Sequence, residues 1–253
     1  MRAKKSLGQN FLQDVGVIER IVDALDLALN DTVIEIGPGR GALTEMLLPR
    51  AGKVIAIEFD RDMVAFLRQR FGGSGLELVE GDVLDIDLGE LVSGTAKLVG
   101  NLPYNISTPI LQRLIECRES FSTIVLMFQR EVVDRITATP GGRDRGFLSV
   151  LVEDAFITES LFDVPPTAFQ PAPKVWSSVI KLTPKRSCVA DMQVFRNVVS
   201  ASFAQKRKTI LNNLKNIFPD AATRLHAADI DGGRRAETLS LDEWLRLTDQ
   251  IKQ

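Results

Sequence analysis

Residues 32–41 read Thr-Val-Ile-Glu-Ile-Gly-Pro-Gly-Arg-Gly, a short apolar run that ends in three alternating glycines. Such a run predicts a buried strand, and the glycines predict a tight turn into the next helix. Glycine also lets a ligand approach the backbone closely. In an open parallel sheet, ligands bind at the carboxyl ends of the strands, where this turn lies. The stretch therefore predicts an α/β fold with a nucleotide-like ligand beside residues 37–41.

The alternation of strands and helices continues along the chain. Short apolar runs predict further strands, and segments with helical spacing lie between them. The predicted strands are 32–36, 53–58, 76–80, 97–99, 122–128 and 175–183, and the predicted helices between them are 42–50, 60–71 and 107–116. Strands that alternate with helices of this length indicate a mostly parallel sheet covered on both faces.

The character of the sequence changes after Pro184. No strand pattern remains, and helices are predicted at 191–218 and 241–251, with a break at Gly232-Gly233. We therefore expect two domains. Residues 1–184 would form the α/β domain, and residues 185–253 a small all-helical domain.

Composition places only loose bounds on the function. The 253 residues are 45% hydrophobic and 25% charged, as is usual for soluble globular proteins. No apolar run is long enough to cross a bilayer, and no apolar segment follows the basic start, so neither a membrane partner nor a secretory signal is expected. Cys117 and Cys188 are far apart, which predicts idle thiols in a reducing cytoplasm rather than a metal site. The net charge of -2 means that any nucleic-acid binding must depend on local patches.

Acidic residues follow the next two predicted strands. Glu58 ends the second strand, roughly 20 residues past the glycines, where a carboxylate can bind both hydroxyls of a ribose. Asp82 follows the third strand and can accept a hydrogen bond from an adenine amine. Together with the glycine turn, these residues form a nucleoside-shaped site. The glycine spacing alone does not separate NAD from S-adenosylmethionine (SAM), because the NAD fingerprint tolerates an alanine such as Ala42 at its last position.

The tetrapeptide Asn101-Leu102-Pro103-Tyr104, after the fourth predicted strand, favours SAM. An adenine N6 amine is a poor nucleophile because its lone pair is delocalised into the ring. The side-chain carbonyl of Asn101 and the backbone carbonyl of Leu102 can accept the two amine hydrogens, while Pro103 fixes the backbone. Tyr104, the single tyrosine of the chain, offers a ring on which the base can stack. Positioning of the amine and electrostatic placement would supply most of the catalysis, and no strong general base would be needed.

Phe169 is a second candidate for stacking. It lies in a segment stiffened by prolines, which could hold the ring against the other face of a flipped base. The alternative is a phenylalanine of the hydrophobic core.

A basic cluster, Lys206-Arg207-Lys208, is expected on a helix whose apolar side carries Phe203, Ile210, Leu214 and Ile217. A solvated helix face is the ordinary alternative for such a run. Further basic residues would enlarge the cluster into a surface for RNA phosphates, namely Arg234, Arg235, Lys185, Arg186, Arg2, Lys4 and Lys5.

These motifs resemble those of the small-subunit ribosomal RNA adenine dimethyltransferases, the KsgA-type family. The matches run in family order over nearly the whole chain. They are Lys5–Leu12, Glu35–Gly41, Glu58, Gly81-Asp82, Asn101–Pro109, Gln129–Val132, Phe169–Ser178, Phe203–Lys208 and Arg235–Leu241. Ala236 stands where the family more often has proline, a departure that touches no catalytic role.

The resemblance implies a Rossmann-like class I SAM methyltransferase fold. It also implies SAM contacts at Asn10, Leu12, Gly37, Glu58, Asp82 and Asn101, and base stacking between Tyr104 and Phe169. The implied reaction is two methyl transfers to each of two adjacent adenines in the hairpin loop near the 3′ end of 16S rRNA. The implied partner is the 30S subunit or its precursor, and we expect a cytoplasmic monomer.

Two other functions stay open on the motifs. A 23S rRNA adenine methyltransferase of the antibiotic-resistance type would share the fold and the chemistry, although Gln129-Arg130-Glu131 and residues 236–240 favour the small-subunit function. A non-catalytic assembly factor could have kept the fold, but the complete set of SAM residues argues against it. DNA amino-methyltransferases more often carry Pro in place of Leu102.

Overall fold

The computed structural model describes residues 4, 7–187, 189 and 191–252. The chain packs as two compact units. The first consists of residues 1–133 and 157–184, and the second of residues 134–156 and 185–253. Packing thus groups the segment 134–156 with the C-terminal helices. The functional division into domains 1–184 and 185–253 stays a prediction.

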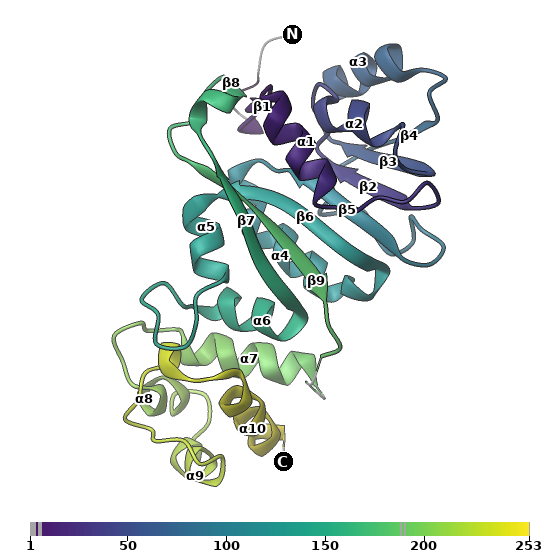
Figure 1. Cartoon of the computed structure of the whole chain (residues 1–253). Coiled ribbons are helices and arrows are strands. Elements are labelled where there is room, and N and C mark those ends of the chain that lie inside the picture. The colour runs from purple at the N-terminus through teal and green to yellow at the C-terminus, as the bar shows by residue number, and fades with distance from the viewer. Residues whose placement is uncertain (1–3, 5–6, 188, 190, 253) are drawn as a thin grey trace. The chain divides into compact units, whose positions relative to one another are not determined.

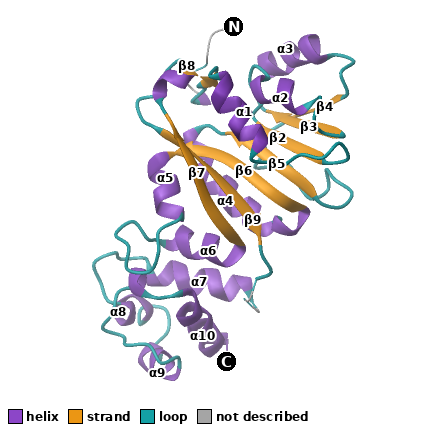
Figure 2. Cartoon of the chain, in the orientation of Figure 1, coloured by secondary structure: helices purple, strands orange, loops and turns teal. Residues whose placement is uncertain are grey.

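The first unit is built on a seven-stranded sheet, orange in Figure 2, with the order β4-β3-β2-β5-β6-β9-β7. The strands are β2 (Thr32–Ile36), β3 (Lys53–Glu58), β4 (Leu76–Glu80), β5 (Ala96–Asn101), β6 (Phe121–Gln129), β7 (Phe156–Val164) and β9 (Ser177–Pro184). Strands β2 to β6 pair in parallel, and β9 pairs antiparallel with β6. The predicted mostly parallel sheet is therefore confirmed, with β7 as a strand that was not predicted.

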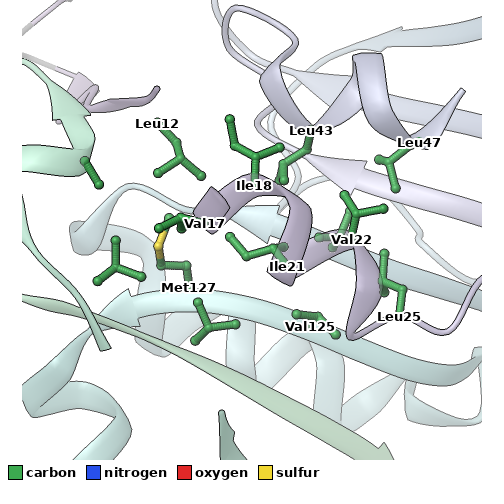
Figure 3. Packing of buried hydrophobic residues seen from close by; sticks show 14 of the residues in the cluster. Leu12, Val17, Ile18, Ile21, Val22, Leu25, Leu43, Leu47, Val125 and Met127 are labelled. Carbon is green, nitrogen blue, oxygen red and sulfur yellow. The ribbon is translucent and has the colours of Figure 1, made fainter. Parts of the chain in front are cut away.

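Helices cover both faces of this sheet. They are α1 (Val15–Asp23), α2 (Ala42–Leu47), α3 (Arg61–Phe71), α4 (Ser107–Glu116) and α5 (Arg130–Ile136). Asp14 caps helix α1, because its carboxylate accepts the Val17 N–H at 3.1 Å. Figure 3 shows the apolar face of α1 packed against side chains of α2 and β6, and Figure 1 shows α4 on the opposite face of the sheet. Each fully buried aliphatic side chain of this core contributes about 1.5–3 kcal/mol.

A two-stranded antiparallel sheet holds the N-terminal segment. Strand β1 (Phe11–Leu12) pairs with β8 (Phe169–Gln170), so that Leu12 lies opposite Phe169. The N–H groups of Gln13 and Asp14 donate to the Ala168 carbonyl at 2.9 and 3.3 Å and extend the pairing. The segment before α1 is thereby fixed to a loop far along the chain.

The second unit contains five α-helices among its described residues. They are α6 (Phe147–Ala155), α7 (Met192–Ser202), α8 (Ile210–Leu214), α9 (Ala221–Ala227) and α10 (Leu241–Lys252). Trp244 of α10 is fully buried, and its ring lies 5.8 Å from that of Phe203. Arg145 is also buried, where it pairs with Glu153 at 2.6 Å and donates to the Leu239 carbonyl.

The single helix predicted over 191–218 is wrong. The amide of Asn213 donates to the carbonyls of Ser202 and Gln205 at 2.6 and 3.2 Å, which satisfies the end of α7. The Thr209 hydroxyl then accepts the Asn212 N–H at 3.3 Å and caps α8. Residues 206–208 therefore lie in the intervening turn, and Ile217, predicted on the apolar side of the helix, is 59% exposed.

Among the described residues, no helix has the length and apolar character needed to cross a membrane, and no cluster of His, Cys, Asp and Glu could hold a metal ion. Burial raises the pKa of the Cys117 thiol to about 11, which makes it a poor nucleophile. Cys188, Arg2 and Lys5 lie outside the described residues.

Candidate cofactor and base-binding site

A pocket lies at the carboxyl ends of β2, β3, β4 and β5, within the first unit. Its walls combine the N-terminal segment with the turns that follow these strands. The lining residues are 7–12, 35–40, 42–43, 57–59, 81–83 and 101–106. The pocket thus brings together nearly all of the predicted cofactor and catalytic residues, namely Asn10, Leu12, Gly37, Glu58, Asp82, Asn101, Leu102 and Tyr104.

The glycine turn presents bare backbone to the pocket. Gly37, Gly39 and Gly41 have φ of 68°, 55° and 78°, a region that favours glycine. A Cβ on Gly39 would lie 3.0 Å from the Phe11 ring, and one on Gly41 would lie 2.4 Å from the Phe71 ring. Packing therefore favours glycine at 39 and 41, and the positive φ of all three glycines agrees with the predicted tight turn.

Glu58 is held across the end of β3. It is only 7% exposed, and its two carboxylate oxygens accept the N–H groups of Gly39 at 3.1 Å and Asp60 at 2.9 Å. Burial raises the pKa of Glu58, and these two hydrogen bonds oppose that shift. The remaining lone pairs of the oriented carboxylate are acceptors of the kind that ribose hydroxyls need.

Asp82 occupies the corresponding place after β4. One of its carboxylate oxygens accepts the Leu84 N–H at 2.9 Å, which fixes the side chain in the turn. The Gly81 N–H donates to the Glu58 carbonyl at 3.0 Å, so the backbone just before Asp82 is held beside the end of β3. This arrangement fits the predicted pair of acceptors for a nucleoside.

Asp60 fastens the N-terminal segment to α3, a contact that the sequence analysis missed. Its buried carboxylate caps α3 and receives hydrogen bonds from Lys4 Nζ at 2.6 Å and Gln9 Nε2 at 2.9 Å. Lys4 also pairs with Asp62 at 2.6 Å, so its charge is used here rather than in a phosphate surface. The only sequence signal was the position of Gln9 inside the 5–12 motif.

Asn101 is oriented by a backbone carbonyl of the same N-terminal segment. Its amide nitrogen donates to the Asn10 carbonyl at 3.2 Å. Because the nitrogen is engaged, the amide oxygen is the end left to accept a hydrogen from a substrate. The sequence predicted an accepting role for this oxygen, and that role stays a prediction.

Tyr104 begins a short 3₁₀ turn, Tyr104–Ile106, at the pocket wall. Its hydroxyl shares a 2.9 Å hydrogen bond with Ser177 Oγ, which fixes the half-buried ring. Burial raises the pKa of Tyr104, so the ring stays neutral and can stack on a base.

Phe169, the second predicted stacking residue, is not a lining residue of this pocket. Its side chain is 5% exposed and packs in the hydrophobic core with Leu12 and Val17. Only a rearrangement that exposes the ring would let a base stack on it. The stacking role of Phe169 stays a prediction.

Glu35, inside the glycine motif, is a buried carboxylic acid that the sequence analysis did not single out. It is 1% exposed and accepts a hydrogen bond from Thr44 Oγ1 at 2.6 Å. Burial, which outweighs this bond, and the neighbouring Glu58 raise the pKa of Glu35 to about 7. The ordinary pKa is 4.5, so between pH 4.5 and about pH 7 the folded protein holds a proton on Glu35 that the unfolded chain releases.

Glu35→Gln is expected to make the free energy of unfolding less sensitive to pH. In the parent, stability falls as pH rises from 4.5 through about 7, because ionising Glu35 in the folded state is unfavourable. Glutamine keeps an acceptor for Thr44 without that cost. The gain should be on the order of 3 kcal/mol at pH 8 and much smaller at pH 5. Urea unfolding at both pH values measures it, and an equal gain at both would contradict the assignment.

The sheet order and the pocket at its carboxyl edge define a class I methyltransferase. Solved structures with this fold include a dimethyladenosine transferase from Plasmodium falciparum, with a TM-score of 0.81 and 30% identity over 94% of this chain and 95% of that one. The 23S rRNA methyltransferase ErmE has a TM-score of 0.74 and 27% identity over 96% and 100% of the two chains.

The chain belongs to the ribosomal RNA adenine dimethylase family, whose model matches residues 1–253. A relative from Geobacter metallireducens, the ribosomal RNA small subunit methyltransferase A, is 44% identical over 98% of this chain and 95% of its own length.

Proposed function

We propose that this protein dimethylates N6 of two adjacent adenines in the 3′-terminal hairpin loop of 16S rRNA, using SAM. Its substrate would be the 30S subunit or a precursor, and it would act as a cytoplasmic monomer. The observation that carries the proposal is the Asn101 amide, held by the Asn10 carbonyl in the pocket that also contains Glu58 and Asp82. Family membership supports adenine as the target, and the name of the Geobacter relative supports the small subunit.

The residues of the pocket fit SAM. Glu58 would hold the ribose hydroxyls and Asp82 the adenine amine, while the backbone at Gly37 allows close approach. Asn10 and Leu12 would contact the cofactor from the N-terminal segment. When bound, SAM supplies a methyl group on a sulfonium, which a nitrogen lone pair can attack.

The chain's own contribution is to position the target amine. The Asn101 amide oxygen and the Leu102 carbonyl would accept the two amine hydrogens and localise the lone pair. Tyr104 would stack on the flipped base, with Phe169 proposed for the other face. The methylated amine is acidic enough to release its proton to water, so the positioning residues need no partner base.

The 23S rRNA function is the nearest alternative. Identity of 44% to the small-subunit relative against 27% to the 23S enzyme supports the 16S assignment. Transfer of labelled methyl groups to 30S subunits and to naked 23S rRNA, with the sites mapped by mass spectrometry, tests it directly. Methylation of 23S rRNA alone would overturn the proposal. Absence of SAM binding would instead favour a non-catalytic assembly factor.

We also propose that the helical domain, residues 185–253, docks on the ribosomal particle. Lys206, Arg207 and Lys208 are all exposed, and none has an ion-pair partner among the described residues. Arg234 is less available, because both of its terminal nitrogens bind the Glu243 carboxylate at 2.5 and 3.1 Å. Arg235 lies 3.9 Å from Glu237, and its side chain is 55% exposed.

Replacing Lys206, Arg207 and Lys208 together with alanine should weaken binding to the 30S subunit and flatten its salt dependence. Each lost phosphate contact lowers the slope of log affinity against log salt by roughly 0.7–0.9. SAM affinity should not change, because these residues are not part of the cofactor pocket. Filter binding over a salt series measures the effect.

The matched control removes three cations that are already paired with acids, Arg50, Lys53 and Arg68. Exposed ion pairs of this kind contribute little to stability, so both triple variants should stay folded. If the two variants bind 30S subunits with the same salt slope as the parent, the cluster is only a solvated surface.

A further inference from the structure

A second hollow lies in the first unit, where β6 ends and β9 begins. Figure 1 shows these two strands side by side. It is lined by Gln129, Arg130, Glu131, Lys174, Val175 and Trp176. These residues come from two of the matched sequence motifs, and the proposed methyl transfer uses none of them. The hollow is therefore a place where two unassigned motifs meet.

Backbone contacts join the two motifs. The Arg130 N–H donates to the Trp176 carbonyl at 3.0 Å, and Gln129 pairs with Ser177 across β6 and β9. The shape of the hollow thus depends on the sheet itself rather than on a free loop.

The hollow and the methylation pocket lie at the same end of the sheet, where the parallel strands β5 and β6 have their carboxyl ends. Asn101 pairs with Met127, two residues before Gln129, and the Tyr104 hydroxyl is hydrogen-bonded to Ser177 Oγ. Because β5, β6 and β9 are consecutive strands, each about 4.8 Å from the next, the two sites are close enough for neighbouring nucleotides of one RNA strand.

The side chains in the hollow suit a nucleobase and its phosphate. Trp176 is 48% exposed, although large aromatic side chains are usually well covered, and the other tryptophan, Trp244, is fully buried. Lys174 is exposed and has no ion-pair partner in the part of the chain that the structure describes. Arg130 pairs with Asp163 at 3.6 Å, yet its side chain remains 55% exposed. An aromatic face beside cations is the usual platform for single-stranded nucleic acid.

We propose that Trp176 stacks on the 16S rRNA base next to the adenine being methylated, with Lys174 binding a flanking phosphate. The inference rests on the proposed function, because the base is defined by its neighbour in the methylation pocket. Sequence-specific recognition of RNA commonly splays out and stacks unpaired bases in this way. Trp176 would hold the flanking nucleotide in place while the target adenine enters the pocket beside Tyr104.

Trp176→Ala should raise the KM for 30S subunits by roughly ten- to a hundredfold, as expected for the loss of one stacked base. The kcat at saturating 30S, the KM for SAM and the thermal unfolding midpoint should stay at parental values. Trp176→Phe keeps an aromatic face and should restore most of the loss. The matched control is Leu29→Ala, which removes an apolar side chain that is 78% exposed. Leu29 precedes β2, so it lies at the amino end of that strand, away from the methylation pocket.

A photoreactive benzoylphenylalanine in place of Trp176 identifies the partner. Crosslinking to 16S rRNA beside the target adenines is expected, and crosslinking to ribosomal protein alone would overturn the inference. An unchanged KM for 30S subunits in Trp176→Ala would also overturn it. So would an equal rise of this KM in Trp176→Ala and Trp176→Phe that is accompanied by weaker SAM binding. If the parent itself does not methylate 16S adenines, the proposed function fails first. If the parent methylates 16S adenines and Trp176→Ala is unaffected, only the stacking role of Trp176 is excluded and the proposed function stands.

Discussion

Asn101→Ala is expected to lower methyl transfer in a single turnover by about a hundredfold or more. The variant loses the amide oxygen that would orient the target amine, and the Asn10 carbonyl loses its 3.2 Å donor. Binding to the 30S subunit should be retained, because docking is proposed for a different part of the chain. Transfer of labelled methyl groups to 30S subunits, run beside a 30S binding assay, measures both quantities.

Two further variants make this test specific. Asn30→Ala removes an exposed side chain of the same type that does not line the pocket, and it should leave transfer close to the parental rate. Tyr104→Ala should impair capture of the flipped base as well as turnover, by roughly 1–3 kcal/mol for one stacking face. Near-normal transfer by Asn101→Ala would exclude the amine-orienting mechanism, and loss of docking would show that docking and chemistry share residues.

Glu58→Ala should weaken SAM binding by about ten- to a hundredfold, because hydrogen bonds to a charged group contribute roughly 1.5–3 kcal/mol. The ribose hydroxyls would lose their shared acceptor, and the N–H groups of Gly39 and Asp60 would lose theirs. Isothermal titration calorimetry measures the affinity. Thermal unfolding of the same variant shows whether the turn still folds.

Glu77→Ala is the matched control for this experiment. Glu77 is a carboxylate on the neighbouring strand β4, half-exposed and paired with Lys53 at 2.7 Å, and it does not line the pocket. Its removal should leave SAM affinity unchanged. Glu58→Gln keeps one acceptor and should show an intermediate loss. Parental affinity in a folded Glu58→Ala variant would remove Glu58 from the cofactor site.

The parallel strands were predictable because each is a short apolar run that ends in a turn signal. Strand β7 was missed because its sequence, Phe156–Val164, shows no regular alternation of polar and apolar residues, and because it follows the apolar helix α6 without a break. The helix predicted through residues 203–209 failed for a different reason. The helix propensity of this segment is overridden by Asn213, which lies 11 residues after Ser202 and satisfies the end of α7 through its side-chain amide.

The site was predictable where a residue's role follows from its place at a strand end, as it does for Glu58, Asp82 and Asn101, which all line one pocket. Contacts between distant segments were not predictable in the same way. The bond from Gln9 to Asp60 and the raised pKa of Glu35 depend on packing that no local pattern encodes. The burial of Phe169 opposite Leu12 is a third case, because the sequence left both a stacking role and a core position open for that ring.

The pairing of β1 with β8 also has a consequence for the order in which the protein is completed during synthesis. Phe11 and Leu12 leave the ribosome well before their partners, Phe169 and Gln170, which lie much further along the chain. Until then, the N-terminal wall of the pocket lacks its pairing with β8, and only its contacts with Asp60 and Asn101 can hold it. A nascent chain should therefore acquire full cofactor affinity late, after its parallel strands β2 to β6 are already available to fold.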